Sequence, residues 1–415
     1  MSIFPRKKSI IGCTINNCMI MQKQERSTRG IYYHNYLFVF GFIYYMIIPL
    51  LIVKYGLLAD YPAIHLLDEY SLSRFFNVYL ICCTIVFISF LAGSRIGARS
   101  WKRKDVCAKE YLLGKPLIDR FIIPIAIVGL FVAFKNRSAL FQGYLAGYDT
   151  SLVGAMATIM ISAMFWLIYE FVAYKRPSKV VVGTVLIFAV ILLGLGSRMY
   201  VVIPVLAGML YLVEYKVIRL RTILFCAFLF AVFVAAMGLI RFGNAINIEG
   251  LLYIGFAEPC LTWISAESMF HYSESLNLFS FPHNFLTTFY NFVPSFIFPD
   301  KGQYIREIAL PYDQPLGATN LIVSLVSNFG IIGSGIFMFC FGYLLSSIRR
   351  HYKSIFGVTF YICFCGVIPF QFFRDNFSIV NKVVVMNLLI VPFLLRQFAL
   401  IFLRRKNKRN EVFIR

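Results

Sequence analysis

The sequence predicts an all-α polytopic membrane protein. Of its 415 residues, 60% are hydrophobic and only 14% are charged, which is too little polar surface to cover a soluble globule of this size. The apolar residues form runs of about 17 to 25 residues, the length with which a helix crosses a bilayer. These runs lack the alternation of polar and apolar residues that is typical of membrane barrels. We therefore expect about ten transmembrane helices and one large external loop.

Ten apolar runs are the candidates for these helices. Two of them are marginal, because run 121–134 needs its flanks to reach across a bilayer and run 199–213 is short and contains Pro204. We expect the first run to be an uncleaved signal anchor, because Asn16 and Asn17 interrupt the apolar part of the segment before it. In chain order the runs are 31–53, 75–93, 121–134, 152–174, 180–196, 199–213, 222–240, 317–346, 355–373 and 379–403.

The placement of basic residues predicts the orientation of the chain. With the N-terminus inside, 30 of the 40 lysines and arginines fall in inside segments, and basic residues near a span are retained in the cytosol. We expect both termini to be cytosolic. The predicted parts are a basic tail (1–30), a bundle of about seven helices (31–240), an external loop (241–316), C-terminal helices (317–403) and a second basic tail (404–415).

The same placement explains the net charge of +21. We assign this excess to topology and to anionic membrane lipid, and we expect no nucleic-acid partner. The ten cysteines do not predict a disulfide framework, because only Cys260 falls in the external loop. They are expected to pack as small hydrophobic residues.

Arginines stand out on the external face, which is otherwise poor in basic residues. Arg198, Arg241 and Arg374 each lie at the end of an apolar run, and Arg306 lies in the loop. A guanidinium offers a fork of donors that suits a diphosphate at the membrane surface. The simpler interpretation is that each arginine extends to lipid headgroups, but four on this face favour a binding site.

The external loop also holds candidates for proton transfer. His283 comes just before an aromatic stretch, and a neutral imidazole is suited to taking a proton from a sugar hydroxyl; an interfacial polar contact is the alternative. His271 and its acidic neighbours have the spacing of a solvated helix face. The alternative bases are Glu258, Glu267 and Glu274.

Several common catalytic motifs are absent from the sequence. It has no Asp-x-Asp, no glycine-rich phosphate loop with Lys-Ser/Thr, no His-Glu-x-x-His and no Cys/His set with metal spacing. We therefore expect no metal and no cofactor. The glycines at 330, 333 and 335 are expected to form a surface for close helix packing.

Short motifs, most of them in the C-terminal half, resemble those of a known family. They are Gly194-Leu-Gly-Ser-Arg-Met-Tyr200, Gly317-Ala-Thr-Asn320 and Asn328-Phe-Gly-Ile-Ile-Gly333, together with Arg306, which is followed by ten residues and then Gly317. With the long external loop, they resemble the Wzy-type polymerases of O-antigen and capsular polysaccharide. The chain also resembles the O-antigen ligases, but Thr319 stands where these have a histidine.

The resemblance implies a fold like that of the GT-C-like membrane glycosyltransferases, in the bacterial cytoplasmic membrane. It implies that repeat units on polyprenyl diphosphate are both donor and acceptor, and that a flippase and a chain-length regulator are partners. Arg198, Arg241, Arg306, Arg374 and Asn320 would bind the diphosphate or substrate, and His283 or Glu258 would act in catalysis.

Two other functions stay open from the sequence. A flippase or other transporter would carry ionisable residues at mid-membrane depth, for which Lys382 and Asn387 are the candidates. A structural partner in a polysaccharide assembly complex would not need an external set of arginines.

Overall fold

The structure, a computed structural model, is helical in every regular element of the residues it describes. These residues are 32–57, 76–99, 113, 115–140, 150–241, 247–272, 276–293, 297–300, 312–351 and 354–412. The main helices are α2 (Tyr33–Phe42), η1 (Ile43–Ile47), α3 (Ile48–Tyr55), α5 (Phe76–Arg99), α6 (Lys115–Lys135), α7 (Thr150–Tyr174), α8 (Lys179–Gly194), α9 (Arg198–Glu214), α10 (Leu220–Arg241), α11 (Ile248–Tyr272), α12 (His283–Thr287), η5 (Thr288–Phe292), α14 (Leu321–His351), α15 (Ile355–Val367), α16 (Gln371–Arg374), α17 (Phe377–Asn381), η7 (Lys382–Ile390) and α18 (Val391–Val412).

Seven helices in the described ranges are long and apolar enough to cross a membrane. All seven coincide with predicted runs, so the all-α membrane architecture is confirmed. The other three predicted runs form α8, α9 and α15, with 16, 17 and 13 residues, and the predicted number of ten spans is not reached. The seven are Tyr33–Tyr55, Phe76–Arg99, Lys115–Lys135, Leu152–Tyr174, Arg221–Leu239, Leu321–Arg350 and Phe377–Ile401.

The ends of two predicted spans are corrected by the structure. Run 355–373 was expected to be one helix, but α15 ends at Val367, because Pro369 cannot supply the backbone N–H that would continue it. The predicted start at Gly317 is also too early. Residues 318–320 are not helical, and the Asn320 side chain accepts the Ile322 N–H (2.9 Å) to begin α14 at Leu321.

Helices α5 and α14 run in the same direction and pack closely through glycines. A Cβ atom added to Gly335 would lie 2.8 Å from Ile85, and one added to Gly97 would lie 2.5 Å from the Tyr343 carbonyl oxygen. Contacts of this kind bring two backbones together without large side chains between them. The prediction that glycines form a packing surface is therefore confirmed for Gly335.

Gly330 has a different role, which the packing interpretation missed. It interrupts α14 with φ 73° and ψ −179°, a conformation that is essentially restricted to glycine. The break exposes backbone groups of α14, and the segment that follows α11 pairs with them. Ser280 N–H donates to the Phe329 carbonyl (3.1 Å), and Ile331 and Ile332 N–H donate to the carbonyls of Asn277 and Leu278 (both 3.0 Å).

Replacing Gly330 with alanine is expected to destabilise the protein by about 2 to 4 kcal/mol. The new Cβ would lie 2.7 Å from backbone atoms of Leu278, and the positive φ disfavours any L side chain. Thermal unfolding in detergent measures the effect. The matched control is Gly183→Ala in α8, where a Cβ meets no atom within 4 Å; equal melting temperatures for the two variants would contradict this role of Gly330.

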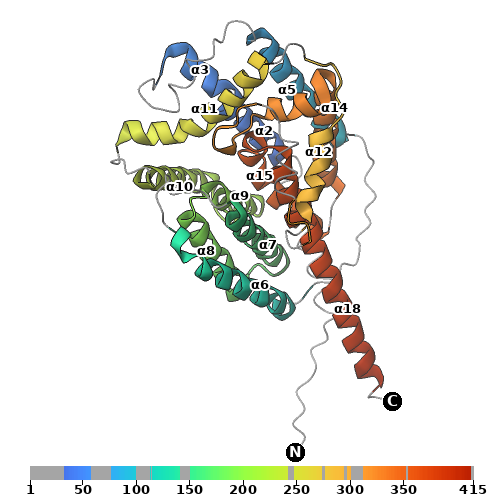
Figure 1. The fold of residues 1–415 in the computed structure, drawn as a ribbon. Helices are drawn as coiled ribbons and strands as arrows, with labels where there is room; N and C mark the ends of the chain where they lie inside the picture. The colour runs from blue at the N-terminus through green and yellow to red at the C-terminus, as the bar shows by residue number, and fades with distance from the viewer. Residues whose placement is uncertain are drawn as a thin grey trace, which may run out of the picture.

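The segment 241–316, expected as an external loop, is largely helical where it is described. Its main element is α11, a helix of 25 residues that contacts α10, α14 and the η1–α3 part of the first span. Figure 1 shows α11 in yellow, running across one end of the molecule above α10. This helix carries Glu258 and Glu267, two of the acidic residues that sequence analysis singled out, and its residues 259–270 are all buried.

A buried polar network joins the opposite end of α14 to its neighbours. His34 of α2 has no exposed surface, and its Nδ1 lies 2.8 Å from the Tyr361 hydroxyl of α15. Its Nε2 lies 3.2 Å from Ser94 Oγ of α5 and 3.1 Å from Ser346 Oγ of α14. Both ring nitrogens therefore have partners, as a buried polar group requires, and four helices are held together by one side chain.

Candidate functional site

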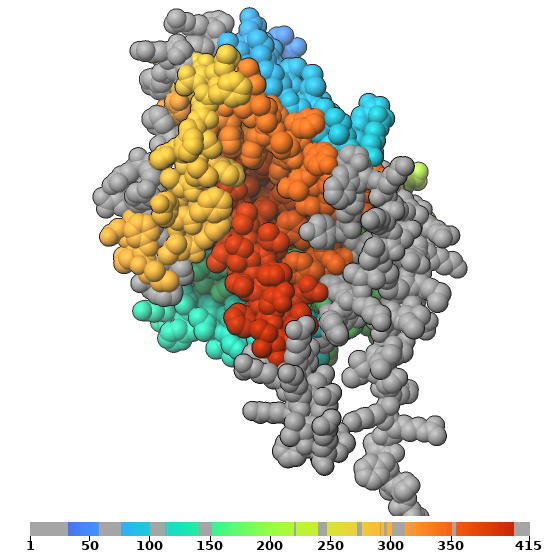
Figure 2. Space-filling model, turned by 90° about the vertical axis from the view of Figure 1, so that its right-hand side faces the viewer, coloured from blue at the N-terminus to red at the C-terminus, as the bar shows by residue number. Residues whose placement is uncertain are grey.

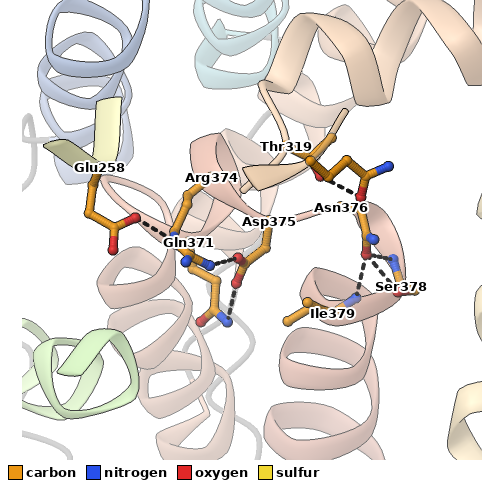
Figure 3. Close-up of polar contacts among 9 residues, drawn as sticks. Glu258, Thr319, Gln371, Arg374, Asp375, Asn376, Ser378 and Ile379 are labelled. Carbon is orange, nitrogen blue, oxygen red and sulfur yellow. Dashed lines mark hydrogen bonds and ion pairs between the residues drawn. The ribbon is translucent and has the colours of Figure 1, made fainter. Parts of the chain in front are cut away.

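An arginine and two carboxylates form the centre of the candidate site (Figure 3). Arg374 Nε lies 2.6 Å from Glu258 Oε2, and its Nη1 lies 2.5 Å from Asp375 Oδ1. The Arg374 side chain is 16% exposed, that of Glu258 is 25% exposed and that of Asp375 is 4% exposed. A guanidinium that bridges two carboxylates uses its planar fork, and the partial burial means that water screens these interactions only weakly.

Arg374 is the last residue of α16, a short helix in the break between α15 and α17. Because α15 ends before Pro369, the short helix α16 and a turn carry the chain across to α17, and Asn376 caps α17 by accepting the N–H groups of Ser378 and Ile379. Gln371 Nε2 donates to Asp375 Oδ2 (2.8 Å) and fixes that carboxylate. The Arg374 carbonyl accepts the Thr319 N–H (2.6 Å). This bond ties the turn to the start of α14.

Glu258 is positioned on α11 by the proline that follows it. Pro259 has no N–H, so the carbonyl of Gly255 loses its partner within the helix. The Tyr44 hydroxyl, from the π-helical turn η1, donates to that carbonyl instead. The neighbouring Tyr45 ring stacks parallel to the Phe373 ring, with centroids 6.1 Å apart. The irregular turn η1 therefore contacts the helix that carries Glu258 and the residue next to Arg374. Turns of π-helix occur often at functional sites.

Arg198 approaches the same carboxylate from the turn between α8 and α9. This turn is tight: Gly196 has φ 79°, and Arg198 is the first residue of α9. Its Nη1 donates to the Val234 carbonyl of α10 (3.3 Å). The guanidinium also packs on Gly238, where an added Cβ would collide with it, so α10 guides the side chain toward α11.

Burial and the neighbouring arginines shift the pKa values of the two carboxyl groups of this cluster in opposite directions. Burial opposes ionisation of Glu258, but the Arg374 guanidinium outweighs it and, with a smaller contribution from Arg198, lowers the pKa of Glu258 below its ordinary value. For Asp375 burial is the stronger effect, and its pKa is raised despite Arg374. Two arginines and two carboxyl groups therefore share one site in which Glu258 is the carboxylate held in its charged form.

A second acidic residue of α11 is held in the opposite state. Glu267 is 9% exposed, and its Oε1 accepts the Trp263 indole N–H (2.5 Å). Its Oε2 has no hydrogen-bond partner among the described residues. Burial raises the pKa of Glu267 to about 8, and the hydrogen bond from Trp263 offsets this only in part. This carboxyl is therefore mainly neutral at pH 7, and it is not on the solvated face that its spacing indicated.

The other predicted residues are distributed around this cluster. Asn320 is fully buried and its N–H donates to Ser265 Oγ of α11 (2.8 Å), so it joins α11 to α14. His283 is exposed at the start of α12; no described contact joins it to Arg374 or Glu258. Arg241 is the last residue of α10, but its side chain, like the whole of Arg306 and Glu274, lies outside the described residues. His271 is exposed near the end of α11.

Sequence reasoning did not identify several members of the cluster. Asp375, Gln371 and Tyr44 were not singled out as site residues, although the pair Arg374-Asp375 beside a helix break was a usable signal. A proline directly after Glu258 was another, because it frees a carbonyl that some buried donor must reach.

The arrangement can bind an anion and accept a proton. Arg198 and Arg374 supply positive charge at one end of the bundle, and Glu258 is an ionised carboxylate beside them. Comparisons of the chain with models of known protein families, with curated proteins and with solved structures gave no match.

Proposed function

We propose that this protein is a membrane glycosyltransferase that joins polyprenyl-diphosphate-linked oligosaccharide repeat units into O-antigen or capsular polysaccharide. It would act at the outer face of the bacterial cytoplasmic membrane, with both termini in the cytosol. The observation that supports this proposal best is the convergence of Arg198 and Arg374 on Glu258. The motifs that resemble Wzy-type polymerases support it as well.

The proposed reaction needs charge at two points. The acceptor hydroxyl oxygen forms a bond to the anomeric carbon of the donor, and the bond from that carbon to the diphosphate oxygen breaks. The diphosphate leaves with the electron pair, and Arg198 and Arg374 stabilise the negative charge that grows on it. Glu258 takes the proton of the hydroxyl, since it is ionised and lies at the same cluster. His283, the other predicted base, has no described contact there.

A lipid-linked oligosaccharide transporter is the second candidate, supported by the last span. Residues Lys382–Ile390 form a π-helical stretch, η7, and irregular turns inside spans are often functional. Asn387 is 2% exposed and its Nδ2 lies 3.4 Å from Thr158 Oγ1 of α7. The Lys382 ammonium lies beside Gly154 of α7. Lys382 is an ionisable residue inside the candidate span Phe377–Ile401, and ionisable residues within spans often mark a transport path.

Deletion of the gene in its host distinguishes the candidate functions, with the wild-type gene on a plasmid as control. Loss of the polymerase should leave single repeat units on their acceptor and no long chains on a gel. If no repeat unit reached the outside, the transporter would be the better assignment. Long polymer accumulating on the polyprenyl carrier would instead indicate a ligase.

A further inference from the structure

Residues 276–293, which follow α11, form an apolar segment packed along two spans. The segment contains no lysine, arginine, aspartate or glutamate. One side of it faces the protein: the Phe285 ring lies 5.6 Å from Phe329, 5.8 Å from Phe337 and 5.5 Å from Phe377, measured between centroids. Figure 2 shows this part of the chain in yellow, lying along α14 and the last span.

The depth of the segment follows from the helices that it touches. Gly335 of α14 lies level with Ile85 and Ser89 of α5, and α14 runs parallel to α5. Gly330 comes five residues before Gly335. At a rise of about 1.5 Å per residue, its level on α5 is about 9 Å from Phe76, the first residue of that helix. The 24 residues of α5 are about 36 Å long, against about 30 Å for the hydrocarbon core, so Gly330 lies inside that core.

The segment continues deeper from this point. Its backbone pairs with α14 on both sides of Gly330, and Phe285 then reaches Phe337, about two helical turns further along α14. At its other end Thr288 Oγ1 accepts a hydrogen bond from Asn381 (2.9 Å), at the end of α17 inside the last span. The segment therefore extends into the thickness of the bundle and does not lie over its end.

Many backbone groups of the segment form hydrogen bonds within the protein. Non-helical backbone is tolerated at this depth only when its polar groups have protein partners. The break at Gly330 supplies three of these bonds. Asn328 Oδ1 accepts the Phe285 N–H (2.7 Å). The hydroxyl groups of Thr287 and Thr288 donate hydrogen bonds to carbonyls of the same segment.

We infer that residues 276–293 form a re-entrant element whose outward side contacts the acyl chains of the bilayer. Most of the outward side chains are large and apolar, and Asn277 and His283 are the exposed polar ones. The apolar ones continue the exposed apolar surface of the two spans that the segment packs against. Phe281 is 72% exposed and Phe279 62%, followed by Leu278, Phe289, Tyr290 and Leu286 at 59, 45, 44 and 43%. No charge in the segment opposes contact with lipid. His283 thus lies on an element inserted in the membrane and not in an aqueous loop.

The test uses tryptophan fluorescence of the full chain in vesicles whose lipids are brominated on the acyl chains. The fluorescence that Phe281→Trp adds to the parent protein should be strongly quenched by bromine and insensitive to iodide in the water. The control is Asp300→Trp, at an exposed turn, which should respond in the opposite way. If Phe281→Trp fails to fold, as judged by gel filtration, Leu278→Trp takes its place.

Two outcomes would overturn the inference. Quenching of the added fluorescence by iodide and not by bromine would place the segment in water. Resistance to both quenchers, with a dimer captured by cross-linking, would mean that a second copy of the chain covers this side. Neither outcome depends on whether the protein is a polymerase, so the proposed function stands or falls separately.

Discussion

Arg374→Lys should reduce the polymerisation of purified lipid-linked repeat units by about 30-fold to 1000-fold, or about 2 to 4 kcal/mol of transition-state stabilisation. Lysine keeps the positive charge but has no planar fork. It cannot hold Glu258 and Asp375 at 2.6 and 2.5 Å while also presenting donors to a diphosphate. An arginine that only extended to lipid headgroups would tolerate this change, because lysine does so equally well.

A second arginine provides the matched control for this experiment. Arg349 lies 2.6 Å from Glu214 and is 18% exposed, close to the values for Arg374, but it belongs to the other end of α14. Arg349→Lys should therefore affect melting temperature to a similar degree and leave the rate unchanged. Equal losses of rate in both variants would show that the effect comes from general packing. Arg374→Ala is less informative, because unpairing the two carboxyl groups should cost about 3 to 5 kcal/mol of stability.

The positions of the spans were predictable because lipid imposes a simple rule on sequence. A helix that crosses hydrocarbon needs a long apolar run, and run 152–174 matches the span Leu152–Tyr174 residue for residue. The rule finds apolar runs of sufficient length but not the helix ends within them, and α8, α9 and α15, with 16, 17 and 13 residues, are shorter than the seven candidate spans. It also says nothing of α11, whose polar residues are spread along a helix that packs partly inside the protein.

The candidate site was predictable in its residue types but not in its pairing. The arginines stood out because topology disfavours them outside, and this argument is local. Arg374 and Glu258 are 116 positions apart, and no spacing rule brings them together. The break at Gly330 was missed for a related reason: a glycine that packs and a glycine with positive φ look the same in sequence, and only the partner segment 277–280 distinguishes them.

Glu267 should make the stability of the protein fall as pH rises from about 5 to about 8. The carboxyl has a pKa of about 8 in the folded protein, against an ordinary value of 4.5. Between these values the unfolded chain has released the proton and the folded protein has kept it, so raising the pH favours unfolding. The resulting loss of stability is about 3 to 5 kcal/mol; it is present in full above pH 8 and absent below about pH 4.5.

Glu267→Gln removes this titration and keeps an oxygen that can accept the Trp263 indole N–H. The variant and the parent should melt at similar temperatures in detergent at pH 5, and the variant should melt well above the parent at pH 8. Glu249→Gln, at an exposed position in the first turn of the same helix, controls for the loss of one carboxyl and should follow the parent at every pH. Parallel curves for Glu267→Gln and the parent would mean that this carboxyl ionises in the folded protein as readily as in the unfolded chain, and that α11 does not bury it.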